Sequence, residues 1–151
     1  MKKLHILLLT VLSSLTQVGL AQKINEAEVP SIVKESFAKK YPGVKVLKWE
    51  KENSDFEVGF YMDKVQSSAI FDPAGNFKEF EQEMSVSEMP KAIIDYSIQN
   101  YHGFHITEAA RITDVNGKTF YELEMDKGKK HFELLFDLQG NFIVQKEPTK
   151  P

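Results

Sequence analysis

The segment FDPAGNF at residues 71–77 recurs as FDLQGNF at residues 136–142, and five of the seven positions are identical. At the same offset of 65 residues, FEV at 56–58 matches YEL at 121–123. Matches that follow the same order at a fixed spacing are typical of an internal repeat. The chain is therefore predicted to contain one structural unit twice.

Nearer the N-terminus, the spacing between matching segments is shorter. YPG at residues 41–43 matches YHG at residues 101–103, at an offset of 60. The change of offset places an insertion of five residues in the second repeat, between Ala109 and Tyr121.

Each repeat opens with a predicted helix. In the first, residues 28–40 place a proline in the first turn, where a helix tolerates it, and Tyr41 ends the helix because a proline follows. In the second, Ser87 is the predicted N-cap, Pro90 lies just inside the helix, and Gly103 ends it. The apolar stripes at helical spacing are Val29, Ile32, Val33 and Phe37, and then Ile93, Ile94, Ser97 or Ile98, and Tyr101.

After each helix the apolar residues change to a period of two, which predicts half-buried antiparallel strands. They are Phe56, Val58, Phe60 and Met62 in the first repeat, and Tyr121, Leu123 and Met125 in the second. Asn116-Gly117 is a strong hairpin signal. Asp72 and Asp137 open Asp-x-x-Gly turns in which glycine takes the left-handed conformation.

These patterns predict an α+β fold. We expect a tandem repeat of one helix followed by a four-stranded antiparallel meander, with both helices packed on one face of the sheet. The first repeat should span residues 22–84 and the second residues 85–151.

Residues 1–21 have the three-part pattern of a secretory signal peptide. A positive start and an apolar run from Leu4 to Leu12 lead to Gly19-Leu20-Ala21, whose small residues favour cleavage before Gln22. The run is well short of the ~20 residues of a membrane span, so we expect no stable membrane insertion after cleavage. No lipobox cysteine is present, and the mature protein is expected to be periplasmic or secreted.

Composition narrows the classes of partner. Removal of residues 1–21 takes the formal net charge from −3 to −5. An acidic exported chain argues against nucleic acid and against an anionic membrane surface as partners. The chain has no cysteine, so packing without disulfides must stabilise it.

No arrangement of residues predicts catalysis, a metal site or a cofactor. The sequence lacks a cysteine nucleophile and a Gly-x-Ser-x-Gly elbow. His102, His105 and His131 lack the spacing of a helical zinc site. The alternating carboxylates of residues 79–83 and 122–126 are interpreted as solvated strand faces or charged edges. We therefore expect no catalytic, metal-binding or cofactor-binding residue.

The sheet face away from the helices is expected to carry an apolar patch. Tyr61 and Phe120 alternate with the core residues Phe60 and Tyr121, so they should point away from the helices. The candidate partner-binding residues are Trp49, Tyr61, Ile70, Phe120, His131 and Leu135, with Glu57, Glu122, Glu124 and Glu133 as a polar rim. An aromatic centre inside a polar rim is typical of a protein-binding surface.

The repeated unit resembles the PepSY-like, β-lactamase-inhibitor-protein-like (BLIP-like) family of exported bacterial proteins. The resemblance extends from about Glu26 to Glu147. It rests on Pro30 and Pro90, on YPG and YHG, and on the two Phe-Asp-x-x-Gly-Asn-Phe turns. It implies a protein-binding or inhibitor-like module that uses an exposed sheet surface, without enzymatic chemistry. The inhibitor label refers to shape and does not identify a β-lactamase as the target.

The leading hypothesis is a non-enzymatic exported binding module whose partner is an unidentified envelope or extracellular protein. The alternative is a small-ligand or envelope-stress sensor of the periplasm, with a pocket between helix and sheet near Trp49 and the histidines. An enzyme is the third hypothesis.

Export gives a direct test. We expect the protein from the envelope fraction to begin at Gln22, because Gly19-Leu20-Ala21 fits the cleavage site. N-terminal sequencing and intact mass measure this. A chain that still begins at Met1 and stays in the membrane would contradict the signal peptide.

Overall fold

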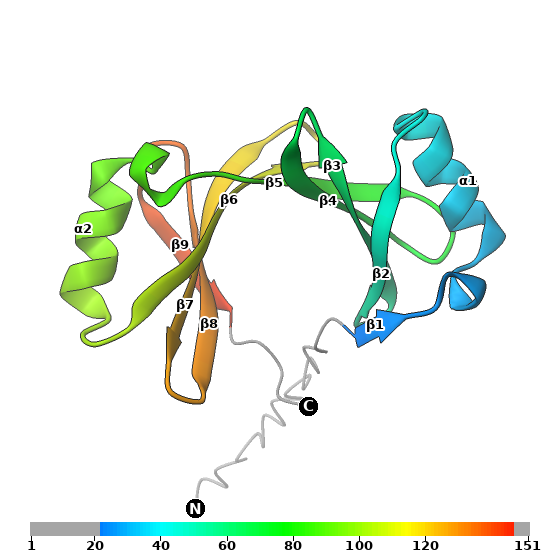
Figure 1. Ribbon diagram of the computed structural model, residues 1–151. Coiled ribbons are helices and arrows are strands. Elements are labelled where there is room, and N and C mark those ends of the chain that lie inside the picture. The colour runs from blue at the N-terminus through cyan, green and yellow to red at the C-terminus, as the bar shows by residue number, and fades with distance from the viewer. Residues whose placement is uncertain (1–21, 147–151) are drawn as a thin grey trace, which may run out of the picture.

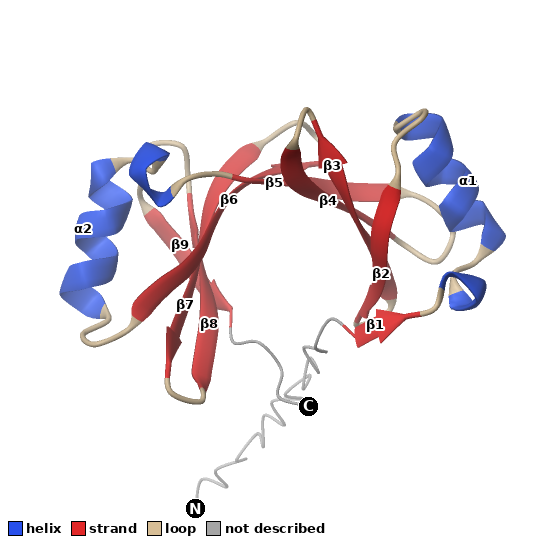
Figure 2. Cartoon of the chain, in the orientation of Figure 1, coloured by secondary structure: helices blue, strands red, loops and turns tan. Residues whose placement is uncertain are grey.

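The computed structural model describes residues 22–146, so the predicted signal peptide lies outside the described residues. The described chain folds into one nine-stranded antiparallel sheet in which the strands follow their order in the sequence. The strands are β1 (Gln22–Ile24), β2 (Val46–Glu52), β3 (Asp55–Met62), β4 (Val65–Phe71), β5 (Phe77–Glu83), β6 (His105–Asp114), β7 (Thr119–Lys127), β8 (Lys130–Phe136) and β9 (Phe142–Lys146). The predicted α+β tandem repeat is confirmed (Figures 1 and 2).

The two helices, α1 (Ser31–Lys40) and α2 (Lys91–Asn100), begin three residues or more after the predicted starts. Pro30 is the N-cap of α1 and not part of its first turn. The residue before a proline is pushed to extended backbone, so the helix cannot reach further back. Neither helix, nor any other helix within residues 22–146, is long and apolar enough to cross a membrane.

A short 3-10 helix precedes each α-helix, at Glu26–Glu28 and Val86–Glu88. Each is closed by a capping box, from Asn25 in the first repeat and from Ser85 in the second. The prediction of Ser87 as the cap of α2 is therefore wrong. The N-cap of α2 is Pro90, which therefore lies before the helix and provides no side-chain cap. Ser85 caps the 3-10 helix instead, because Glu88 supplies the glutamate three residues later that a capping box requires.

The two repeats join edge to edge. β5 of the first repeat pairs with β6 of the second, with Gln82 opposite Arg111 and Glu83 opposite Ala110. β1 pairs with β2 in the same register as β5 pairs with β6. At the offset of 60 residues, the Gln22–Lys51 pair corresponds to the Gln82–Arg111 pair. The N-terminal strand thus occupies the place beside β2 that β5 occupies beside β6.

The Asp-x-x-Gly turns have one common geometry. The Asp72 carboxylate accepts hydrogen bonds from the backbone N–H groups of Ala74 and Asn76, both at 2.9 Å. Asp137 repeats this pattern after β8, and so does Asp114 between β6 and β7. Gly117 has φ 78° and Asn116 is not among the residues with positive φ. The hairpin predicted at Asn116-Gly117 is confirmed, but it is not the two-residue turn that needs positive φ at both residues.

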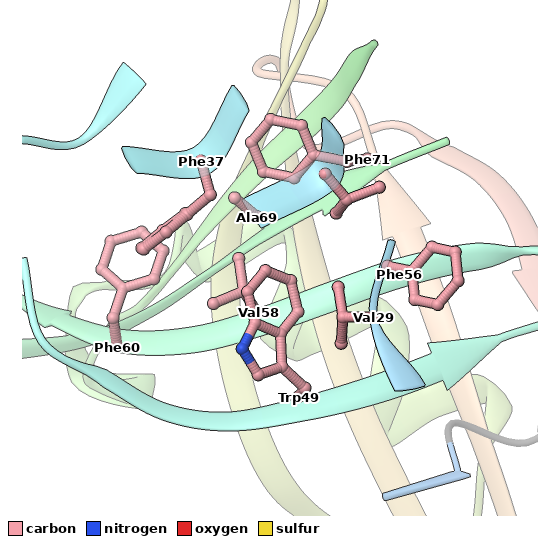
Figure 3. Close-up of a cluster of buried hydrophobic side chains, with 9 residues drawn as sticks. Val29, Phe37, Trp49, Phe56, Val58, Phe60, Ala69 and Phe71 are labelled. Carbon is pink, nitrogen blue, oxygen red and sulfur yellow. The ribbon is translucent and has the colours of Figure 1, made fainter. Parts of the chain in front are cut away.

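The core of the first repeat lies between α1 and the sheet. Phe37 of α1 contacts the rings of Trp49, Phe60 and Phe71, with centroid distances of 5.2–6.4 Å (Figure 3). Val33 is fully buried beside them. Ile32, predicted as part of the stripe, is 46% exposed, because only one side of the ten-residue helix faces the sheet.

The second repeat has an equivalent core beneath α2. Ile93 and Ser97 face the sheet, and the Ser97 hydroxyl donates a hydrogen bond of 2.8 Å to the Ile93 carbonyl. Ile98 is 62% exposed, so of the two residues predicted for the buried stripe of this helix, Ser97 is the one that faces the core. Phe136 is fully buried and contacts the rings of Tyr96 and Phe142.

Truncation of Phe136 tests the second core. Phe136→Ala should reduce the free energy of unfolding by about 3–5 kcal/mol, because a buried ring is replaced by a cavity. Leu138→Ala is the matched control in the turn that follows, where the side chain is 49% exposed, and it should change stability by less than about 0.5 kcal/mol. Urea denaturation measures both. Equal effects of the two substitutions would contradict this core.

Candidate functional site

The sheet curves into an arch with both helices on its outer side (Figure 1). Among residues 22–146, no helix lies on its inner side (Figure 1). We call this side the concave face and define it by the side chains that alternate with the core residues along each strand. Glu57, for example, lies between the buried Phe56 and Val58 of β3.

Carboxylates dominate the concave face. They are Glu50, Glu52, Asp55, Glu57, Glu79, Glu81, Glu83, Glu108, Asp114, Glu122, Glu124, Asp126 and Glu133. Several lie directly opposite one another on neighbouring strands: Glu50 faces Glu57, and Glu124 lies between Glu108 and Glu133. Like charges directly opposite each other destabilise a sheet, so this arrangement opposes folding.

Burial raises the pKa values of seven of these carboxylates, namely Glu52, Glu57, Glu79, Glu81, Glu108, Glu122 and Glu124. Burial, reinforced by neighbouring carboxylates, raises the pKa of Glu52 and of Glu108 to about 7. Burial also raises the pKa of Glu81 and of Glu122, and Glu122 is 6% exposed. Glu133 of the second repeat helps to raise the pKa of Glu52 in the first. The two halves of the concave face therefore share one electrostatic environment.

Lys146 of β9 partly compensates this negative charge. Its Nζ atom lies 3.6 Å from a carboxylate oxygen of Glu122 and 3.8 Å from one of Glu133. Burial opposes the charged form of Lys146, but Glu122, Glu133 and other carboxylates outweigh it and raise the pKa. One ammonium group thus interacts with a carboxylate of β7 and with a carboxylate of β8.

Lys48 of β2 has the corresponding role in the first repeat. Its Nζ atom lies 2.6 Å from a Glu50 oxygen. Its methylene chain crosses Gly59 of β3, where an added Cβ would come within 2.9 Å of Lys48 Cγ. A glycine inside a strand weakens it, and here the glycine makes room for the lysine.

Most of the predicted partner-binding residues lie on the concave face. Tyr61 is 54% exposed, and Ile70, Phe120, His131 and Leu135 are half-buried. Phe120 has the Lys118 Nζ atom 4.8 Å from its ring centroid. His131 Nε2 lies 3.5 Å from a Glu124 oxygen.

The assignment of Trp49 to this surface is wrong. Trp49 lies opposite Val58 on the helix-covered face and is 3% exposed. Its phase in β2 was ambiguous in the sequence because the strand has a bulge between Val46 and Lys48, which shifts the register by one residue. The Trp49 side chain therefore belongs to the core.

The polar rim also differs from the prediction. Glu122 lies at the centre of the concave face, between Ala110 and Leu135 on the neighbouring strands, and is nearly inaccessible to solvent. Ile112, which was not predicted for this face, lies between Glu81 and Phe120 and is 4% exposed. Ile112 pairs with Glu81 across the β5–β6 junction between the two repeats. The pattern within one repeat therefore could not predict this contact.

The chemistry that this surface offers is the acceptance of positive charge. Within residues 22–146, no three His, Asp or Glu side chains form a group that could hold a metal ion. The carboxylates are distributed over a broad sheet face with apolar side chains between them. Such a surface can accept positive charge at several points along the strands.

One family profile matches most of the chain. The family described as "Putative beta-lactamase-inhibitor-like, PepSY-like" matches residues 18–63 and 58–144. Among curated proteins no match is found.

Three solved structures are similar to the described fold. A DUF2874 family protein from Bacteroides uniformis is 18% identical with a TM-score of 0.64, and the alignment covers 80% of this chain and 90% of that one. A structure from Bacteroides eggerthii, titled "putative periplasmic proteins", is 15% identical with a TM-score of 0.64 and the same coverage. A BLIP-like protein from Bacteroides fragilis is 20% identical with a TM-score of 0.59, over 81% of this chain and 88% of that one. At these identities the similarity shows the fold alone.

The raised pKa values predict how stability depends on pH. The folded chain holds protons on Glu52 and Glu108 up to about pH 7, whereas the unfolded chain releases them near 4.5. Folding is therefore favoured at the lower pH, and this contribution is lost as pH rises from about 4.5 to about 7. The melting temperature should be several degrees higher at about pH 5 than at about pH 8.

Glu108→Gln should raise the melting temperature at about pH 8 and reduce the difference between the two pH values, because the amide carries no charge to desolvate. Glu35→Gln, on the exposed surface of α1, is the control and should change neither. Thermal unfolding followed by circular dichroism measures all three proteins. A wild-type melting temperature that is unchanged or higher at pH 8 would contradict the prediction.

Proposed function

The chain belongs to the PepSY-like, β-lactamase-inhibitor-like family, and from that premise we propose that it is a non-enzymatic exported module that binds a protein partner on its concave face. The partner is an envelope or extracellular protein, which the protein meets after removal of its signal peptide.

The observation that carries the proposal is the density of half-buried carboxylates on a sheet face without a helix. A sheet face that served only solubility would carry its charges in full contact with water. Here burial raises the pKa of Glu52, Glu57, Glu79, Glu81 and other carboxylates, which reduces the stability of the free protein. Residues that lower stability without a structural gain are typical of functional surfaces.

The charge of the face indicates the charge of the partner. A partner surface rich in lysine or arginine would stabilise the ionised carboxylates and lower their pKa values on binding. Binding should therefore release protons, weaken at low pH and weaken with added salt.

The apolar side chains of the concave face supply anchors for such a partner. Tyr61 is the most exposed, and Phe120 lies beside Ile112 on the neighbouring strand. Aromatic side chains near the centre of an interface contribute most of the binding energy in many protein complexes. The combination supports a protein partner over a small ion.

The alternative of a small-ligand sensor with a pocket between helix and sheet has less support. Trp49, its expected lining residue, is packed against Phe37 and Val58 in the core. His102 and His105 are exposed at the end of α2 and the start of β6, away from Trp49 in the other repeat.

Affinity capture from envelope extract with matched baits tests the proposal. The wild-type protein and a control variant, Ile98→Lys on the outer surface of α2, should capture the same partner. Tyr61→Ala/Phe120→Ala should lose it, since each truncated anchor should weaken binding by about 1–2 kcal/mol. Isothermal titration calorimetry with the purified partner, in two buffers of different ionisation enthalpy, measures affinity and proton release.

Two results would contradict the proposal. One is a captured protein that binds Tyr61→Ala/Phe120→Ala as tightly as wild type while both variants remain folded. The other is binding that is independent of pH between about 5 and 8, since the carboxylates would then be absent from the interface.

A further inference from the structure

The C-terminal strand β9 differs from its counterpart in the first repeat in a way that concerns the sheet edge. The offset of 65 residues makes β5 the counterpart of β9. Lys78 of β5 corresponds to Ile143, and Glu79 corresponds to Val144. The interior strand therefore carries the charges, whereas the strand at the edge carries the apolar side chains.

This is the reverse of what an edge strand needs. β5 is covered on both sides by β4 and β6, but β9 pairs only with β8 within the described residues. Edge strands usually carry charged side chains that prevent pairing with other molecules. In β9 the consecutive residues Phe142, Ile143 and Val144 are 37%, 44% and 40% exposed.

An ion pair of the first repeat has no counterpart in the second repeat. In the first repeat, Lys78 extends to Asp55 of β3, with Nζ 2.6 Å from a carboxylate oxygen. The corresponding residues in the second repeat are Ile143 and Phe120, which cannot form an ion pair. β9 therefore lacks the ion pair that β5 makes at this position.

We propose that the outer edge of β9, at residues 142–144, pairs antiparallel with β9 of a second copy of the chain, to form a twofold-symmetric dimer with a continuous sheet. The first repeat shows the kind of element that covers this edge: β6 covers β5 as an antiparallel strand. The dimer places a strand at the same position.

Symmetry and charge favour a second copy as the occupant. Antiparallel pairing of a strand with itself is closed by a twofold axis, so it stops at a dimer. The other edge, β1, has three residues, and pairing of β9 with β1 would continue without closure. β9 contains no acidic residue, so its pairing with a second copy brings no carboxylates of the two strands together.

The dimer has a consequence for the concave face. A twofold axis perpendicular to the sheet leaves both concave faces on the same side of the continuous sheet. A five-residue strand pair is a small interface, so we expect a dimer that dissociates on dilution. The inference does not depend on the proposed function, because it concerns the edge and not the partner.

Sedimentation equilibrium over a range of protein concentrations tests the proposal. The wild-type protein should show a reversible monomer–dimer equilibrium. The variant Ile143→Lys/Val144→Lys should weaken dimerisation by about 100-fold or more, because it brings lysines of the two copies together in the paired strands, where like charges repel. Ile98→Lys, at a more exposed apolar position on α2, is the control and should dimerise like wild type.

Cysteine crosslinking gives a second measurement that does not depend on the charged variant. The chain has no cysteine, so single substitutions at residues 142–145 are clean reporters. A residue close to the twofold axis has its Cα within disulfide distance of its own copy. At least one of these cysteines should crosslink on mild oxidation, whereas Val115→Cys in the β6–β7 turn should not.

Three results would overturn the proposal: a wild-type protein that is monomeric throughout the concentration range, a dimer unaffected by Ile143→Lys/Val144→Lys, or crosslinking from Val115→Cys as strong as from β9. A monomer whose β9 edge is taken up by a strand of another protein falls under the first result. Circular dichroism shows whether the charged variant folds. If it does not fold, the crosslinking yields of the cysteine variants test the dimer instead.

Discussion

Successive side chains of a β-strand point to opposite faces, and the other features of this molecule depend on how the two faces of one sheet are used. Two helices of ten residues cover the outer face, which carries Phe60, Phe71, Phe136 and the other large core residues. Nothing within residues 22–146 covers the inner face. The sheet curves around that face, so its side chains crowd together and lose water although no second layer lies over them.

The curvature explains why the carboxylates of the concave face have unusual pKa values. On a flat sheet, Glu52 and Glu133 would be far apart, at opposite ends of the strand order. On the arch, Glu133 helps to raise the pKa of Glu52. Two lysines compensate part of the negative charge of the concave face. Lys48 lies in β2 of the first repeat, and Lys146 lies in β9 of the second. The remaining negative charge lowers the folding stability of the free protein, and a cationic partner would reduce this destabilisation.

The sequence predicts the fold well because the fold is local and repeated. The FDPAGNF and FDLQGNF turns, the apolar alternation and the prolines before α1 and α2 each determine structure within a few residues. Predictions failed where a distant or irregular feature decides the outcome. A bulge in β2 moved Trp49 into the core, and the β5–β6 junction between repeats buried Ile112. The crowding of Glu122 depends on the curvature of the whole sheet, which no strand pattern encodes.

The two repeats also act as internal controls for each other. Positions that agree between them, such as Asp72 and Asp137, or Val33 and Ile93, are positions where the common fold requires a certain chemistry. Positions that differ have been free to follow the situation of each repeat. Gly59 of the first repeat corresponds to Glu124 of the second, so the concave face holds a lysine stem at one site and a carboxylate at the other. Lys78 and Ile143 differ in the same way, where one strand is interior and the other is an edge. The core has diverged as well, because Phe37 corresponds to Ser97 and Trp49 to Ala109, so each helix packs on the sheet through a different set of side chains. The common fold therefore depends on the turns, the alternation along the strands and the burial of each position, and not on the identity of each core residue.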